Sequence, residues 1–220
     1  MKKSTSIICG LLGLSLVIMI HEFGHFLAAK LFGVAVPLFS IGFGPGLFGV
    51  RIGGTLFQLA LFPIGGYVAI AQKELAAQPY LIKMIILTAG IAANFLFAYF
   101  LLLFFRFRQI NIRALLMEAS GKFNDSVIGP IGIISIISYS AALGLTHYLL
   151  VLASLSMGIG MFNLLPIPFF DGGQIAWYTV EALFGKLPES ISDISSTIFF
   201  VLFLLFILFI TFRDVRRFRG

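Results

Sequence analysis

The sequence predicts a mainly α-helical, polytopic membrane protein with about four transmembrane helices and a membrane-associated β-hairpin or small sheet between the first and second. Hydrophobic residues make up 60% of the 220 residues and charged residues only 11%, and the mean hydropathy is +1.07. A soluble domain carries about 25% charged residues to form a solvated shell. Lipid must therefore be part of this chain's solvent.

Four apolar runs are long enough to span or line a membrane. The first is apolar except for the cluster His21, Glu22 and His25, the second is ended by Arg106 and Arg108, and the fourth is closed by the basic tail RDVRRFRG. Met1-Lys2-Lys3 before an apolar run imitates a signal peptide, but no small-residue cleavage site follows, so we expect the segment to be retained. The four expected spans are residues 6–32, 81–105, 143–162 and 194–212.

A segment of different composition, residues 36–70, separates the first two spans. It is rich in glycine and in residues that favour β-strands, and Gly53-Gly54 is typical of a hairpin turn after which residues 56–61 form a strand. Irregular backbone persists at membrane depth only where protein or a water-filled cavity shields it. We therefore expect a small sheet that dips into the membrane beside the first helix.

We expect residues 1–220 to form a single membrane-embedded domain. The connection 106–129 is polar but too short for a folded accessory domain. The net charge of +6 does not indicate nucleic-acid binding, because the basic residues lie at the ends of apolar runs, where they anchor helices to headgroups. Cys9 lies inside an apolar run and is interpreted as a small buried hydrophobe.

The motif HEFGH, residues 21–25, is the main chemical signal in the sequence. On a helix, positions i and i+4 share one face, so His21 and His25 can direct ring nitrogens at one metal ion. Zinc accepts this arrangement and keeps one position open for water in catalytic sites. Glu22 follows the first ligand directly and is placed to take a proton from that water.

Such a motif also arises by chance, and the alternative is a helix without a metal. In this chain, however, the motif puts three ionisable groups at membrane depth, where each costs about 2.5 kcal/mol or more unless it is satisfied. A metal ion satisfies all of them together. The membrane context therefore favours a metal site.

Asp171 is the best candidate for a third protein ligand. It lies in NLLPIPFFDGG, residues 163–173, as an acidic residue among apolar ones. Pro166 and Pro168 break the preceding helix, and Gly172-Gly173 allows the chain to turn so that the Asp171 side chain can approach a neighbouring helix. The alternative is that Asp171 only caps a helix that begins near Gly172.

HEFGH and NLLPIPFFDGG together resemble the site-2 protease family of intramembrane metalloproteases, and within it the bacterial regulator-of-sigma-E branch. The similarity continues in order through FSIGFGPGLF, PIGGYV, TAGIAANF and GPIGI. The resemblance implies a Zn²⁺ cofactor held by His21, His25 and Asp171, with Glu22 as the catalytic base. It also implies a single-span membrane protein as substrate and a place in the bacterial inner membrane.

The resemblance implies a further contact from Asn163 to the substrate or the oxyanion. Asn94, in a Gly-x-x-x-Asn motif that starts at Gly90, is implied to help hold the substrate. The chain differs from the bacterial proteases that it resembles in one respect. Those proteases carry PDZ domains between their second and third spans, where this chain has only the connection 106–129. A filter independent of PDZ domains, or an adaptor protein, would have to select substrates.

The expected reaction is peptide-bond hydrolysis. We expect the substrate to be held extended by adding a strand to a sheet edge within residues 56–61. The alternative is a non-proteolytic zinc-binding membrane scaffold or a transporter. An intact Glu22 argues against a scaffold, and the absence of repeated halves argues against a transporter.

Two observations disagree about orientation. With four spans, both termini and the connection 106–129 share one side of the membrane, and that side carries ten of the fifteen Lys and Arg residues. The positive-inside rule would place it in the cytoplasm. The family resemblance places the HEFGH end of the first helix near the cytoplasm, and we favour this second orientation.

Overall fold

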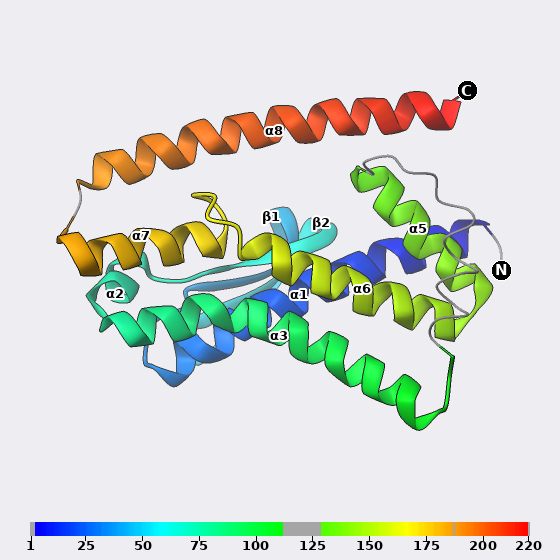
Figure 1. The fold of residues 1–220 in the computed structure, drawn as a ribbon, viewed down its shortest axis with the longest axis horizontal. Helices are drawn as coiled ribbons and strands as arrows, with labels where there is room; N and C mark the ends of the chain where they lie inside the picture. The colour runs from blue at the N-terminus through cyan, green and yellow to red at the C-terminus, as the bar shows by residue number, and fades with distance from the viewer. Residues whose placement is uncertain (1–2, 112–128, 187, 220) are drawn as a thin grey trace.

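The computed structural model describes residues 3–111, 129–186 and 188–219. Most of the connection that we expected in place of a PDZ module therefore lies outside the described residues. Figure 1 shows the arrangement of the helices and strands. In chain order they are α1 (Lys3–Leu31), β1 (Leu38–Ile52), β2 (Thr55–Ala69), α2 (Gln72–Ala77), α3 (Tyr80–Phe107), α5 (Pro130–Leu143), α6 (Leu145–Asn163), α7 (Asp171–Phe184) and α8 (Glu189–Arg219).

The predicted fold class is confirmed: the chain is a multi-pass, mainly helical membrane protein with a small sheet between its first two spans. Four of the described helices are long and apolar enough to cross a membrane. The N-terminal end of α1 and the C-terminal end of α8 lie at the same end of the molecule (Figure 1), as an even number of spans requires. The spans are Ile7–Leu31, Tyr80–Phe107, Leu145–Asn163 and Ser196–Arg216.

The apolar lead-in to the third span forms a helix of its own, α5, which we did not expect. Pro130 lies in its first turn, where the missing backbone N–H costs nothing. Gly144 separates α5 from α6 with a φ of 128°, a conformation that favours glycine. A change of direction at one glycine thus divides a continuous apolar run into two helices.

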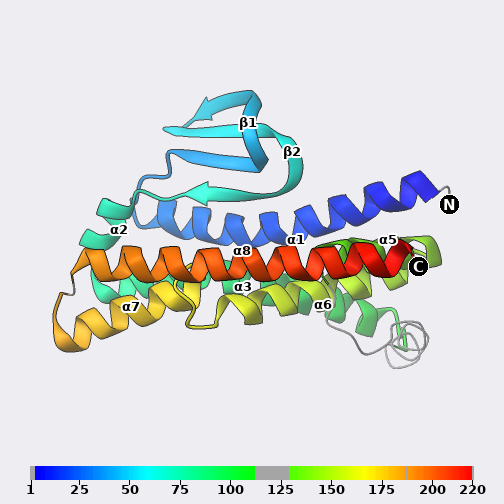
Figure 2. The same cartoon turned by 90° about the horizontal axis from the view of Figure 1, so that it is seen from above.

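Each of the two strands bends sharply and contributes two segments to the sheet. Gly42 and Gly44 have positive φ in β1, and Gly65 has positive φ in β2. Segment 38–41 pairs with 56–59 on one side and with 66–69 on the other, while segment 46–52 pairs with 55–60. The order across the sheet is therefore 46–52, 55–60, 38–41 and 66–69, with the last segment next to α1 (Figure 2).

The predicted turn at Gly53-Gly54 is confirmed, since both residues have positive φ, as a type I′ turn requires. The expectation that residues 56–61 offer the free sheet edge is wrong. Residues 56–59 are paired on both sides, because the bends bring segment 38–41 against them. The edge that faces the helices is instead segment 66–69.

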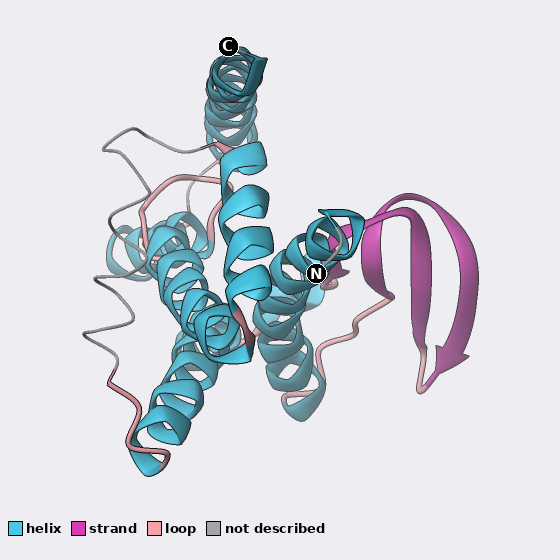
Figure 3. Cartoon of the chain, turned by 90° about the vertical axis from the view of Figure 1, so that its right-hand side faces the viewer, coloured by secondary structure: helices cyan, strands magenta, loops and turns pink. Residues whose placement is uncertain are grey.

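The sheet lies alongside α1, on the side opposite the other long helices (Figure 3). Two hydrogen bonds attach its inner edge to α1: the Gly65 N–H donates to Ser15 Oγ at 2.9 Å, and the Val68 N–H donates to Glu22 Oε2 at 3.0 Å. The inner edge strand is therefore fixed beside the part of α1 that carries HEFGH.

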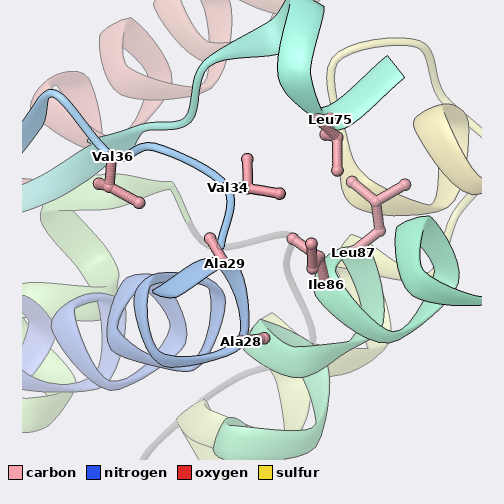
Figure 4. Close-up of a cluster of buried hydrophobic side chains, with 7 residues drawn as sticks. All are labelled: Ala28, Ala29, Val34, Val36, Leu75, Ile86 and Leu87. Carbon is pink, nitrogen blue, oxygen red and sulfur yellow. The ribbon is translucent and has the colours of Figure 1, made fainter. Parts of the chain in front are cut away.

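Two buried clusters hold the helices together. The first joins the end of α1, the following loop, α2 and α3 (Figure 4), and consists of Ala28, Ala29, Val34, Val36, Leu75, Ile86 and Leu87. The second, formed by Val17, Ile137 and Leu152, joins α1 to α5 and α6. The helix α8 lies at the periphery of the bundle (Figure 1). The described part of the molecule is thus built around α1, which contacts both clusters and the sheet.

Candidate metal centre

The structure brings His21, His25 and Asp171 together at one point between α1 and α7. Nε2 of His21 and Nε2 of His25 lie 3.2 Å apart. Oδ2 of Asp171 lies 3.0 Å from the first of these nitrogens and 3.2 Å from the second. The two imidazoles come from successive turns of one helix, and the carboxylate comes from the first turn of another.

The chemistry and spacing of these three groups fit zinc. A tetrahedral zinc ion with bonds of about 2.0–2.1 Å holds neighbouring ligand atoms about 3.3 Å apart. The three facing atoms are separated by almost this distance, and all three lie within 4.8 Å of one another. His21 is 5% exposed and His25 6%, so the site excludes most water. Three protein ligands leave one tetrahedral position open.

Glu22 lies beside this group but points elsewhere. Its carboxylate accepts a hydrogen bond from the Val68 N–H on the inner edge of the sheet. It is not part of the group of potential ligands. The site therefore contains a separate carboxylate, close to the ligands along α1, that is available for proton transfer.

One face of α3 fixes His25. The Ile86 carbonyl oxygen lies 2.8 Å from His25 Nδ1 and accepts a hydrogen bond from Nδ1–H when Nε2 is the metal ligand. Gly90 lies one turn further along α3, and a Cβ atom there would overlap the His25 ring. Gly24 plays the matching role on α1, since its Cβ would overlap the Ala89 carbonyl oxygen. The His25 ring thus lies directly against the backbone of α3.

The loop after α6 determines where Asp171 lies. A Cβ at Gly172 would overlap the Leu164 carbonyl oxygen, and one at Gly173 would overlap the Ile167 carbonyl oxygen. The N-cap of α7 is Phe170, without a side-chain capping bond. The carboxylate of Asp171 contacts the histidines instead of capping the helix.

Asn94 contacts a histidine. Its side chain is fully buried on α3, with Nδ2 3.3 Å from His21 Nδ1. Ser156 on α6 donates from Oγ to the Asn94 backbone oxygen at 2.9 Å and to Asn94 Oδ1 at 3.2 Å. We did not anticipate Ser156, and nothing in the sequence distinguishes it from the other serines of the apolar runs.

Asn163 is not brought to the centre by any described contact. Its Nδ2 donates to the Ile159 carbonyl oxygen of its own helix at 3.0 Å. It lies at the C-terminal end of α6, where the loop to Asp171 begins. A contact from Asn163 to a substrate stays a prediction.

Parts of this chain are similar to known proteins. A Fusobacterium nucleatum protein provisionally named a zinc metalloprotease is 43% identical over 97 residues, 40% of this chain and 29% of that protein. A Clostridium perfringens protein of the same provisional name is 39% identical over 100 residues, 42% and 30% of the two chains. The Arabidopsis thaliana membrane metalloprotease ARASP, chloroplastic, is 39% identical over 98 residues, 39% and 22% of the two chains.

The matched stretches thus span less than a third of the length of these relatives. A match to a whole protein family covers more of this chain than the matches to individual relatives do. Peptidase family M50 matches residues 9–206, which include α1 with HEFGH, the sheet, and α7 with Asp171. On this match, the chain belongs to peptidase family M50.

Proposed function

We propose that this protein is an intramembrane zinc metalloprotease that hydrolyses peptide bonds in or near the transmembrane segments of other membrane proteins. The observation that carries the proposal is the convergence of His21, His25 and Asp171 with a separate carboxylate, Glu22, beside them. Membership of a peptidase family and the four apolar helices support it. Family membership also supports a location in the bacterial inner membrane.

The geometry of the site assigns different chemical roles to the three metal ligands and to Glu22. His21, His25 and Asp171 would hold a zinc ion, which would supply Lewis-acid polarisation of the scissile carbonyl group. Oε1 or Oε2 of Glu22 takes the proton from the attacking water and returns it to the leaving amine. The buried setting of the two histidines limits access of bulk water and strengthens these electrostatic interactions.

The substrate we propose is a single-span membrane protein, locally unwound at the cleaved bond. Segment 66–69 is the sheet edge nearest Glu22, and an extended peptide can add to such an edge through main-chain hydrogen bonds. The edge would hold the substrate backbone close to the proposed base. An adaptor in place of PDZ gating remains part of the proposal.

A zinc-binding scaffold or transporter is the second candidate. The metal-holding group does not include Glu22, so a protein that only stored or carried zinc would not need this carboxylate at that point. Glu22 is also held by a backbone N–H from the sheet. A positioned carboxylate outside the ligand set favours hydrolysis over metal storage.

The test combines metal analysis with a cleavage assay. Wild type and Glu22→Gln, purified in detergent, are incubated with a model single-span substrate. Glu74→Gln is the matched control, because Glu74 accepts a bond from the Ala35 N–H but lies outside the site. We expect about one zinc ion per chain in all three proteins. Wild type and the control should cleave, Glu22→Gln should not, and a chelator should stop cleavage.

Two results would contradict the proposal. Zinc-loaded wild type that cleaves no substrate from a varied panel would favour the scaffold. A chain without affinity for zinc would refute the metal centre itself.

A further inference from the structure

The contact between Asn94 and His21 raises a question of proton placement. For Nε2 of His21 to bind a metal, its lone pair must be free, so the ring proton must be on Nδ1. This nitrogen lies 3.3 Å from Asn94 Nδ2, which is also a donor. Two donors facing one another make no hydrogen bond. The metal-loaded site therefore requires an acceptor at this position.

A half-turn of the Asn94 amide supplies that acceptor, since its oxygen and nitrogen are nearly identical in shape. Oδ1 then faces Nδ1–H of His21, and Nδ2 faces Ser156 Oγ across the 3.2 Å now spanned by Oδ1. Ser156 can accept from Nδ2 while its own proton goes to the Asn94 backbone oxygen at 2.9 Å. Each of these donors then has one acceptor.

Burial makes the pairing of these polar groups matter for stability. Asn94 and Ser156 are both fully buried, and an unpaired buried polar group costs about 1–3 kcal/mol. The Asn94 backbone oxygen, at 2.9 Å, is nearer to Ser156 Oγ than Asn94 Oδ1 is, at 3.2 Å, and a hydroxyl that donates to the nearer oxygen can only accept from the side-chain amide. Ser156 thereby favours the orientation in which Asn94 presents its oxygen to His21.

We propose that Ser156 and Asn94 form a positioning relay that keeps the proton of His21 on Nδ1 and presents its Nε2 to zinc. Both are positioning residues, since neither reaches the metal-binding atoms or the substrate edge directly. The relay rests on the proposed zinc site but not on proteolysis. The Ile86 carbonyl oxygen accepts from Nδ1 of His25 as Asn94 would accept from Nδ1 of His21, so each of the two histidine ligands has its own partner on α3.

The test measures zinc affinity without substrate, by competition with a chromophoric chelator. Asn94→Leu keeps the volume and removes the acceptor, so we expect zinc affinity to fall about 10–100-fold, as is usual for outer partners of metal ligands. Asn94→Asp keeps an acceptor toward His21 and should bind zinc within a few-fold of wild type. Ser156→Ala should weaken binding less than Asn94→Leu does.

Three additional readouts separate positioning from folding. Ser140→Ala is the control, because Ser140 is also buried but its hydroxyl donates to the Ile137 carbonyl oxygen of its own helix, and it should leave zinc affinity unchanged. The visible spectrum of the Co²⁺-loaded protein should change in Asn94→Leu and be restored in Asn94→Asp. Ser156→Ala should have no further effect when combined with Asn94→Leu, because the two act in series.

The relay is overturned if Asn94→Leu binds zinc like wild type with an unchanged Co²⁺ spectrum, or if Asn94→Asp is as defective as Asn94→Leu. Additive losses from Asn94→Leu and Ser156→Ala would remove Ser156 from the relay and overturn it as stated. Failure of wild type to bind zinc would refute the metal centre and the relay together. Normal zinc binding without proteolysis would refute only the proposed function.

Discussion

The metal centre depends on two glycines, whose lack of a Cβ atom lets α1 and α3 approach each other closely. Gly24 and Gly90 face each other's helices at the level of the metal centre, and a Cβ on either would overlap its neighbour. This close approach allows a backbone carbonyl, that of Ile86, to reach His25. Small residues at helix interfaces in membranes commonly permit such contacts. Here the contact also orients a metal ligand.

Gly90→Ala should therefore damage the metal centre specifically. The new Cβ would overlap Nε2 of His25, and overpacking of this kind costs about 1–3 kcal/mol. We expect zinc affinity to fall by about 10-fold or more, measured by chelator competition. The control is Gly158→Ala on α6, where an added Cβ meets nothing within 4 Å and zinc affinity should be unchanged. Equal affinity in both variants would mean that the His25 ring can move aside freely.

At the scale of residues, the sequence predicts the chemistry of the site better than its support. The spacing of His21 and His25 and the unusual place of Asp171 among apolar residues led directly to the group that the structure assembles. The Ile86 carbonyl could not be predicted, because a backbone oxygen carries no sequence signal. Ser156 could not be predicted either, because the facing of an apolar helix is set by packing.

At the scale of elements, segment 66–69 connects the sheet to α1. Its Val68 N–H is bonded to Glu22, so the edge strand helps to orient the proposed base. Val68→Pro removes this donor. We expect cleavage to fall about 10-fold or more while zinc content stays at the wild-type level. Val68→Ile, which keeps the N–H, should retain activity in the same cleavage assay.

Loss of zinc together with cleavage in Val68→Pro would indicate that the proline disrupts the whole site. Full activity in a zinc-loaded Val68→Pro protein would show that the bond to Glu22 is dispensable.

The sheet also shows where prediction from sequence fails. The turn at Gly53-Gly54 could be recognised because its dipeptide has a local conformational requirement. The bends at Gly42, Gly44 and Gly65 could not be distinguished from other glycines of this segment. Since those bends determine which segment forms the inner edge, the edge was assigned to residues 56–61 and found at 66–69.

At the scale of the molecule, α8 is joined to the rest by few described contacts. Asp214 is 5% exposed and accepts a hydrogen bond from the Gly132 N–H at the start of α5, at 3.0 Å. The ring of Phe203 packs against Phe169 and Phe170 in the loop before Asp171. Among the described residues, the contacts that hold this peripheral helix thus include one buried carboxylate and one aromatic cluster.

Asp214→Ala should loosen α8 without emptying the metal centre. The Gly132 N–H would be left unpaired, at a cost of about 1–3 kcal/mol. We expect a lower midpoint of thermal unfolding in detergent and unchanged zinc affinity. Asp214→Asn keeps an acceptor and should unfold close to the wild-type temperature. An unchanged midpoint in Asp214→Ala would show that the hydrogen bond to Gly132 does not stabilise the packing of α8.

The overall class of the fold followed from composition, because a chain with so few charges has few ways to be soluble. The spans were located to within a few residues, since their ends are marked by charged residues or glycine. How α5 and α8 pack could not be predicted, because lipid-facing and protein-facing apolar surfaces have the same composition.

The unequal lengths of the spans connect the metal centre to the membrane's thickness. At 1.5 Å per residue, α3 is about 42 Å long and α6 about 28 Å, whereas the hydrocarbon layer is about 30 Å thick. A helix longer than the hydrocarbon layer is accommodated by tilting, by kinking or by local thickening of the bilayer. Ile86, Gly90 and Asn94, which support both imidazoles, all lie on this longer helix. The lipid composition of the membrane thus becomes a physical input to how the zinc ligands are aligned.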